Sequence, residues 1–100
     1  MVAGEVHARF HIASAGIVVG AGFFFDLSRS DWLIVILTIA LVISLEAVNT
    51  AVEAISDLVS PEPHPAIKLA KDVSAGAVLI AAIAALFVAI LIFGPHIRSL

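Results

Sequence analysis

Cysteine is absent from this sequence of 100 residues, and charged residues make up only 13% of it. Without cysteine the chain has no disulfide framework, no thiol nucleophile and no thiolate-bound metal. Its formal net charge of −3 provides no basic surface for nucleic acid, so no nucleic-acid partner is expected. The pattern G-x-x-x-x-G-K-[ST] is also missing, which excludes a P-loop enzyme. Few side chains therefore remain as candidates for chemistry.

Hydrophobic residues, in contrast, make up 62% of the chain, and its mean hydropathy is +1.19. A soluble domain of this size could not bury that much apolar surface. The sequence therefore predicts an integral membrane protein. We expect no cleavable signal at its N-terminus, because polar residues from Glu5 to His11 interrupt the apolar sequence too early.

Turn-forming residues divide the apolar sequence into three runs. DLSRSD at 26–31 interrupts it first, and SPEPHP at 60–65 interrupts it again with three prolines in five positions. Gly94-Pro95 is expected to end the third run. Each run has about 20 residues or more, enough for a helix to cross about 30 Å of hydrocarbon. We predict one all-α membrane domain over residues 1–100, a helical bundle with three transmembrane helices at about 8–27, 32–58 and 67–93.

The basic residues predict how the bundle is oriented. Three spans place the N-terminus and the 60–65 loop on one side of the membrane, and the 26–31 turn and the C-terminus on the other. Three basic residues lie on the first side and two on the second: Arg9, Lys68 and Lys71 against Arg29 and Arg98. The positive-inside rule then favours a cytoplasmic 60–65 loop.

Four polar residues interrupt the second span, in EAVNTAVEAISD at 46–57. Glu46, Asn49, Glu53 and Asp57 share a helical stripe about 80° wide, at about 100° per residue. A carboxylate that faced lipid would cost several kcal/mol. We therefore expect this polar stripe to face the bundle interior or a wet cavity.

Depth along the helices brings other charged residues to the same place. Counting about 1.5 Å per residue from the outer boundary puts Glu5, Glu53 and the Lys71-Asp72 pair at one level near the cytoplasmic interface. Glu46 lies less far along, within the hydrocarbon of the inner leaflet. Three helices are thus predicted to bring acids and a cation together.

Such a cluster suits phosphoryl transfer to a lipid. Carboxylates at an aqueous boundary are ligands for Mg²⁺, which usually brings a polyphosphate with it. The reaction also needs a base for the attacking hydroxyl and cations for the phosphates. Glu46 lies where a lipid hydroxyl would arrive, and removal from water makes a carboxylate a better base.

Other functions remain open from the residues alone. The polar side chains could simply hold helices together in lipid. They could relay protons or cations in a small transporter or channel, although the outer half of every span is apolar. A non-catalytic membrane subunit is a further alternative.

Several other features are interpreted as structural. His7 and His11 are four residues apart, but the Glu of H-E-x-x-H is absent, so we expect interfacial histidines and no metal site. Trp32 is expected to be an interfacial anchor. Small residues in the first and third spans predict close helix packing. They are Gly16 and Gly20, and Ala70, Ser74, Ala77, Ala81 and Ala84.

The E-x-x-N-T-A-x-E-x-x-x-D motif of 46–57, the SPEPHP loop and AKDVSAGAVLIAA (70–82) together resemble the prokaryotic diacylglycerol kinases and their undecaprenol kinase relatives. The likeness runs from about Glu5 to Gly94. It implies a three-helix membrane kinase that assembles as a homotrimer, with active sites at subunit interfaces. It also implies transfer of the γ-phosphate of MgATP to a lipid hydroxyl at the cytoplasmic face of the bacterial inner membrane.

The resemblance implies roles for residues of the first two spans. Glu46 matches the catalytic base, which contacts the lipid substrate. Glu5 and Glu53 match the metal ligands and are also expected to bind the nucleotide. Asn49 and Asp57 match further polar positions of the active site.

The resemblance implies a nucleotide site at the 60–65 loop and the start of the third span. Glu62 and His64 match a loop that meets the nucleotide. Lys71 and Asp72 match a pair at its phosphates.

The sequence also departs from the family pattern. Members usually begin with an amphipathic surface helix before the first acid, whereas only MVAG precedes Glu5 here. Ala8 replaces the aromatic residue that usually precedes Arg9, a further polar position of the site. Ala75, at a lipid-contacting position, stands where diacylglycerol kinases of the Gram-negative type have Ser. The S-P-E-x-H-P loop resembles the undecaprenol kinase branch more and favours a polyprenol substrate slightly over diacylglycerol.

Overall fold

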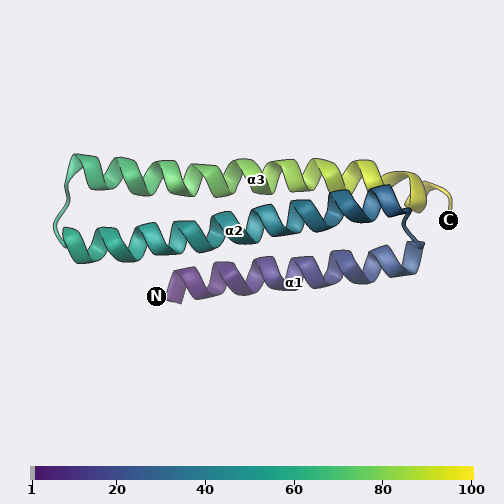
Figure 1. The fold of residues 1–100 in the computed structure, drawn as a ribbon, viewed down its shortest axis with the longest axis horizontal. Helices are drawn as coiled ribbons and strands as arrows, with labels where there is room; N and C mark the ends of the chain where they lie inside the picture. Colours follow the sequence, from purple (N-terminus) through teal and green to yellow (C-terminus); the bar gives the residue numbers. More distant parts are fainter. Residues whose placement is uncertain (1) are drawn as a thin grey trace.

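A computed structural model describes residues 2–100 of the chain, with side chains from Ala8 onward. It contains three α-helices in chain order, α1 (Val2–Phe25), α2 (Arg29–Val59) and α3 (Pro65–Arg98), which run up, down and up along a long bundle (Figure 1). α2 packs against both of the others, whereas α1 and α3 meet mainly where Phe25 packs against Phe93 and His96. All three helices are long and apolar enough to cross a membrane, which confirms the predicted number of spans.

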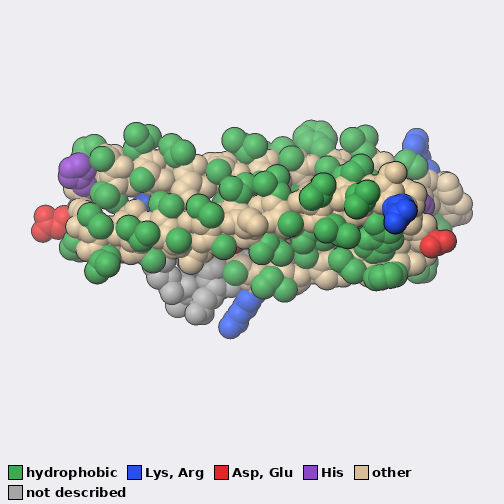
Figure 2. Space-filling model, in the orientation of Figure 1, with side chains coloured by type: hydrophobic (Ala, Val, Ile, Leu, Met, Phe, Trp, Pro, Cys, Tyr) green, Lys and Arg blue, Asp and Glu red, His purple; other side chains and the backbone are tan. Residues whose placement is uncertain are grey.

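The surface of the bundle is suited to lipid rather than to water. Large apolar side chains are exposed on every helix, among them Ile17 on α1, Leu37 on α2 and Leu91 on α3. Figure 2 shows apolar side chains along the whole visible face, with the few charged groups mainly towards the two ends. The protein is thus an integral membrane protein, as its composition predicted.

The first helix ends in a motif that is stabilised by two backbone hydrogen bonds. The N–H of Leu27 donates to the carbonyl of Gly22 at 3.2 Å, and the N–H of Asp26 donates to that of Phe23 at 3.3 Å. Asp26 adopts a positive φ of 53°, a conformation that Asp tolerates better than most residues. This pair of bonds around one left-handed residue is a Schellman motif. It turns the chain sharply enough for α2 to pack back on α1.

The second helix begins earlier than the sequence predicted. The Oγ of Ser28 accepts a hydrogen bond from the N–H of Asp31 at 3.1 Å, so Ser28 is the N-cap and α2 begins at Arg29 rather than Trp32. A serine followed three residues later by an acid is a helix-start signal. The predicted turn at 26–31 is therefore shorter, because its second half forms the first turn of α2.

Trp32 also packs against α1, a contact that the sequence did not predict. Its ring is half-buried against Gly22, where an added Cβ would lie 2.6 Å from Cη2 of the indole. The indole also packs against the ring of Phe23, with the ring centroids 4.9 Å apart. The absence of a side chain at Gly22 lets α1 and α2 approach each other beside the turn.

The loop at 60–65 separates α2 from α3 as predicted. Ser60 ends α2, and its N–H still donates to the carbonyl of Ser56. Pro65 is the first residue of α3, a position that suits proline because the first helical N–H has no partner in the helix. His64 caps this start, since its Nδ1 accepts from the N–H of Ala66 at 3.1 Å.

Gly94-Pro95 does not end the third helix, so that prediction was wrong. α3 continues beyond Pro95 although a proline removes one helical hydrogen bond. The ring Nδ1 of His96 lies 2.9 Å from the carbonyl oxygen of Ile92. The Oγ and the N–H of Ser99 both donate to the carbonyl of Pro95. These side-chain and cap contacts support the final turn.

The predicted small-residue packing faces hold only in part. Gly16 and Gly20 are exposed, and a Cβ added at either would meet nothing within 4 Å in the described chain. On α3, Ala81 is buried, whereas Ala70 and Ala84 are exposed. Within one chain, the middle of the small-residue stripe on α3 therefore packs against a neighbouring helix, whereas Gly16 and Gly20 on α1 remain exposed.

Candidate active site

Glu46 is buried in the bundle, with only 5% of its surface exposed. Its Oε2 lies 3.2 Å from Nε2 of His11 on α1. A neighbouring hollow of about 110 Å³ is otherwise bordered mainly by small and apolar side chains. They are Ala8, Ile12, Ile43, Ala47 and Thr50, together with the pair itself. The predicted inward orientation of Glu46 is therefore what the structure has.

His11 is the functional candidate that the sequence reasoning missed. It was expected to be an interfacial histidine, but it lies inside the bundle as the partner of Glu46. The sequence does contain a signal for this contact, because counting residues inwards from the outer boundary puts the two side chains at similar depths. His11 is 15 residues from Asp26, and Glu46 is 14 residues from Trp32. At about 1.5 Å per residue these separations are about 22 and 21 Å, so both side chains lie at one level.

Asn49 is the second buried polar residue of α2. Its Nδ2 lies 3.4 Å from Oε1 of Glu53, which is half-buried one turn further along. No donor from the described side chains reaches its Oδ1, although this atom is buried. A buried acceptor without a donor typically costs about 1–3 kcal/mol, so it is a position where an incoming donor would be favoured.

The buried polar stripe then continues to Ser56 rather than to Asp57. Ser56 is buried, which the sequence reasoning did not predict, and Asp57 is exposed, which corrects the expected inward orientation. The reason is partly angular, because Ser56 lies about 60° from Glu53 on the side of Asn49. The second reason is that α1 is shorter at this end. α2 and α3 extend beyond its first turn, so α1 does not cover Asp57 (Figure 1).

Asp57 instead connects α2 to α3 through Lys71. The Nζ of Lys71 lies 2.6 Å from Oδ1 of Asp57, and the charge of Glu53 also acts on this amine. Asp72, predicted to act with Lys71, instead accepts from Nζ of Lys68 at 2.7 Å within α3. Lys71 and Asp72, which were expected to act together, therefore contact different residues. Exposed ion pairs of this kind contribute little to stability, so a phosphate could displace either one.

The remaining predicted residues lie at or near the same end of the bundle. Glu62 is exposed in the 60–65 loop, and His64 holds the start of α3 through Nδ1, which leaves its Nε2 free for another contact. Arg9 on α1 and Ala75 on α3 are exposed. The side chain of Glu5 lies outside the described residues.

The described residues can supply part of a magnesium site. No group of three or more His, Asp or Glu side chains close enough to share a metal occurs among them. Mg²⁺ is usually held by one or two carboxylates, with phosphates and water completing its shell. Glu53, half-buried and fixed by Asn49, fits the role of one such carboxylate.

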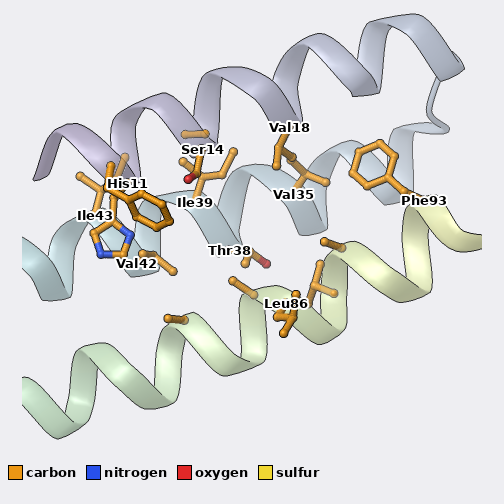
Figure 3. A pocket seen from close by; sticks show the side chains of 16 residues that line it. His11, Ser14, Val18, Val35, Thr38, Ile39, Val42, Ile43, Leu86 and Phe93 are labelled. Atoms are coloured by element: carbon orange, nitrogen blue, oxygen red, sulfur yellow. The ribbon is translucent and has the colours of Figure 1, made fainter. Parts of the chain in front are cut away.

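An apolar cavity of about 280 Å³ adjoins this polar site. It lies between the three helices, with His11 at one end and Phe93 at the other (Figure 3). Its walls include Val18, Val35 and Leu86, and its few polar side chains are His11, Ser14 and Thr38. His11 borders both this cavity and the hollow at Glu46. The arrangement suits a molecule with a long apolar chain and a polar end.

Residues 1–93 match the family model described as prokaryotic diacylglycerol kinase. The chain belongs to the prokaryotic diacylglycerol kinase family. This membership confirms the resemblance found in the 46–57 motif, and it makes the protein a lipid kinase.

Three relatives show how far the similarity extends. An undecaprenol kinase of Bacillus subtilis is 41% identical over 93 residues, which cover 93% of this chain and 76% of the relative. A diacylglycerol kinase of Synechocystis is 40% identical over 93 residues, covering 92% of this chain and 53% of the relative. A diacylglycerol kinase of Pseudomonas aeruginosa is 33% identical over 78 residues, covering 78% of this chain and 63% of the relative. The match thus spans about half to two thirds of the two diacylglycerol kinases and more of the undecaprenol kinase.

Proposed function

We propose that this lipid kinase transfers the γ-phosphoryl group of ATP to the hydroxyl of a membrane lipid, with Glu46 as the general base. The observation that carries the proposal is the burial of Glu46 beside an apolar cavity between transmembrane helices. A buried carboxylate is costly in lipid surroundings and marks a functional site. Structural contacts alone would not require a carboxylate beside an open hollow.

In this reaction the lipid hydroxyl donates a hydrogen bond to the carboxylate of Glu46. As its proton moves to the carboxylate, the hydroxyl oxygen attacks the γ-phosphorus and ADP leaves. The apolar surroundings of Glu46 exclude water, which would otherwise compete as the phosphoryl acceptor. The hollow of about 110 Å³ beside Glu46 has room for a hydroxyl group.

Glu53 and Glu5 are the residues that we assign to magnesium. Bound Mg²⁺ would neutralise charge on the phosphates of ATP during transfer. The hydrogen bond from Asn49 holds one oxygen of Glu53, which leaves the other oxygen for the metal.

The nucleotide is assigned to the cytoplasmic end of the bundle, at the 60–65 loop. Lys71 would exchange its exposed contact with Asp57 for a phosphate, where a cation offsets negative charge. Asp72, Glu62 and His64 lie on the same end and are the proposed contacts to the rest of the nucleotide.

The lipid substrate is proposed to be undecaprenol, with diacylglycerol as the second candidate. The relative with 41% identity is named an undecaprenol kinase, and the SPEPHP loop resembles that branch. The apolar cavity between the helices is suited to a hydrocarbon chain whose hydroxyl reaches Glu46.

We further propose that the protein works as a homotrimer in the bacterial inner membrane, with its active sites on the cytoplasmic side. Large apolar side chains remain exposed on all three helices, which leaves surface for packing between copies. Glu53 is only half-buried and Asp57 is exposed, so a neighbouring copy could close the site over them.

The direct test gives the purified protein ATP, Mg²⁺ and either undecaprenol or diacylglycerol in detergent micelles. The proposal predicts a phosphorylated lipid with both ATP and Mg²⁺ present, with undecaprenol as the faster substrate. Omission of Mg²⁺ is the control for the metal. No phosphorylation of either lipid would contradict the proposed function, and faster phosphorylation of diacylglycerol would reverse the substrate assignment alone.

A further inference from the structure

The contact between His11 and Glu46 is an interhelical polar contact inside the span, and the proposed reaction does not yet use it. Nε2 of His11 lies 3.2 Å from Oε2 of Glu46, and the two side chains are 17% and 7% exposed. One belongs to α1 and the other to α2. Phosphoryl transfer by Glu46 alone would not need a histidine at this place.

We propose that His11 is a positioning residue that holds the Glu46 carboxylate in the orientation needed for proton transfer. This inference rests on the proposed role of Glu46 as the base. The Nε2–H of a neutral His11 donates to Oε2, which leaves Oε1 to receive the proton of the lipid hydroxyl. A carboxylate with one oxygen held this way loses much of its rotational freedom, and fixed geometry is what proton transfer requires.

The surroundings of the pair explain why a positioning donor is needed. The hollow beside Glu46 is lined mostly by small and apolar side chains, and only Thr50 among them carries another polar group. The Oγ1 of Thr50 donates to the backbone carbonyl of Glu46 at 3.0 Å and so does not hold its carboxylate. Among the described side chains, His11 is the donor that reaches Glu46.

The position of His11 also connects the base to the apolar cavity. The His11 ring borders the cavity at the end away from Phe93, as well as the hollow at Glu46 (Figure 3). The Phe10 ring packs against the imidazole in a T-shaped arrangement, with the centroids 5.7 Å apart, which restrains the imidazole from one side. A lipid hydroxyl that arrives through the cavity would therefore pass the imidazole before it meets Glu46.

The test compares three substitutions of His11 with one control substitution at another histidine. His11→Gln keeps an N–H donor close to the position of Nε2. His11→Phe keeps a planar ring without a donor, and His11→Ala removes both the ring and the donor. His96→Ala is the matched control, because His96 is also half-buried but contacts the carbonyl of Ile92 at the far end of α3. Each protein is assayed for kcat and for the KM of ATP and of the lipid.

We expect kcat to fall roughly 10- to 100-fold in His11→Ala and His11→Phe, the range for losing a hydrogen bond to a charged group. KM for ATP should stay unchanged. His11→Gln should recover most of the rate, because its side-chain N–H can still donate to the carboxylate of Glu46. His96→Ala should keep the rate of the unaltered protein. Equal rates for His11→Phe and His11→Gln, or an unchanged kcat in His11→Ala, would overturn the proposal.

A second measurement does not depend on activity. In protein labelled with ¹⁵N-histidine, the Nε2 signal that His11→Gln removes is assigned to His11 and is compared between the unaltered protein and Glu46→Gln. The chemical shift of this signal should change, because the Nε2–H loses the charged oxygen to which it donates. An unchanged chemical shift would overturn the pairing. If the unaltered protein phosphorylated no lipid while the chemical shift still changed, the proposed reaction would fail and the His11–Glu46 contact would stand.

Discussion

At the residue scale, the site is a line of polar groups on one face of α2 that differ in exposure. Glu46, Asn49 and Ser56 are buried, Glu53 is half-buried, and Asp57 is exposed. Among the three carboxylates, exposure increases from the level of the apolar cavity to the end of the bundle. It matches a reaction in which a lipid arrives from the membrane and a charged nucleotide from water.

Lys71 and Lys68 provide a matched pair for testing the phosphate contact. Both form exposed ion pairs, but only Lys71 reaches across to α2, near Glu53. Lys71→Ala is expected to raise KM for ATP by roughly 10-fold or more, the effect of losing one charge-assisted contact. Lys68→Ala should change it by less than about 2-fold, because an exposed pair within one helix contributes little. Steady-state kinetics with varied ATP decide this, and equal effects of the two changes would contradict the assignment of Lys71.

Glu53 can be separated from Asp57 by its metal dependence. Glu53→Gln keeps the side-chain volume but removes the charge that Mg²⁺ requires, so the Mg²⁺ concentration for half-maximal rate should rise by roughly 10-fold. Asp57→Asn, which changes a carboxylate that is exposed and paired with Lys71, should leave this concentration within about 2-fold. A titration of the rate with Mg²⁺ measures both. A Glu53→Gln enzyme with the metal dependence of the unaltered protein would exclude Glu53 as a ligand.

At the element scale, the turn between α1 and α2 fixes how the His11 and Glu46 helices lie against each other. The two backbone bonds that end α1 and the Ser28 cap that begins α2 leave only residues 26–28 between the helices. Trp32 then packs on Gly22 beside the turn. A short connection of this kind sets which residues of the two helices face each other at the level of the site.

Gly22 gives a direct test of that close approach. Gly22→Ala would place a Cβ 2.6 Å from Cη2 of Trp32 and is expected to destabilise the fold by about 1–3 kcal/mol, the range for overpacking. Gly20→Ala is the control, because nothing lies within 4 Å of the added Cβ and alanine favours a helix by up to about 1 kcal/mol. Thermal unfolding in detergent compares the two. A Gly22→Ala protein as stable as the unaltered one would contradict the packing described for the turn.

The sequence predicted the helices better than their ends and contacts. Three spans follow from long apolar runs, because hydropathy summed over about 20 residues outweighs any single residue. The start of α2 depended instead on one side-chain contact at Ser28, and the end of α3 on whether neighbouring groups support Pro95.

The polar stripe shows the same limit within the site. A helical period places Glu46, Asn49 and Glu53 on one face, and the structure turns that face towards the bundle. The period alone could not show that Asp57 lies beyond the cover of α1, or that His11 rather than a second acid meets Glu46. Such contacts depend on how two helices lie relative to each other.

At the scale of the whole molecule, one chain forms three long helices with little interior. Few apolar side chains among the described residues are buried, and the cluster around Leu27, Val35, Ile92 and Phe93 lies near the α1–α2 turn and the end of α3. The candidate site lies towards the opposite end of the bundle, away from this cluster. Assembly of several copies would complete the packing at that end.

The proposed homotrimer can be tested by mass. Multi-angle light scattering in detergent should give a protein mass of about three times the 10.4 kDa chain. Exposed apolar side chains on all three helices should then become protected from lipid-soluble labels where copies meet. The mass of a single chain under conditions in which the protein phosphorylates lipid would contradict the trimer.

The most direct test of the central claim is the rate of lipid phosphorylation by Glu46→Gln. This change removes the base but keeps the size of the side chain and a group that can accept from His11. We predict that kcat falls by roughly 100-fold to 10,000-fold, the contribution of a positioned base, while thermal stability and KM for ATP stay close to those of the unaltered protein. A folded Glu46→Gln protein that turns over lipid at the normal rate would contradict the account.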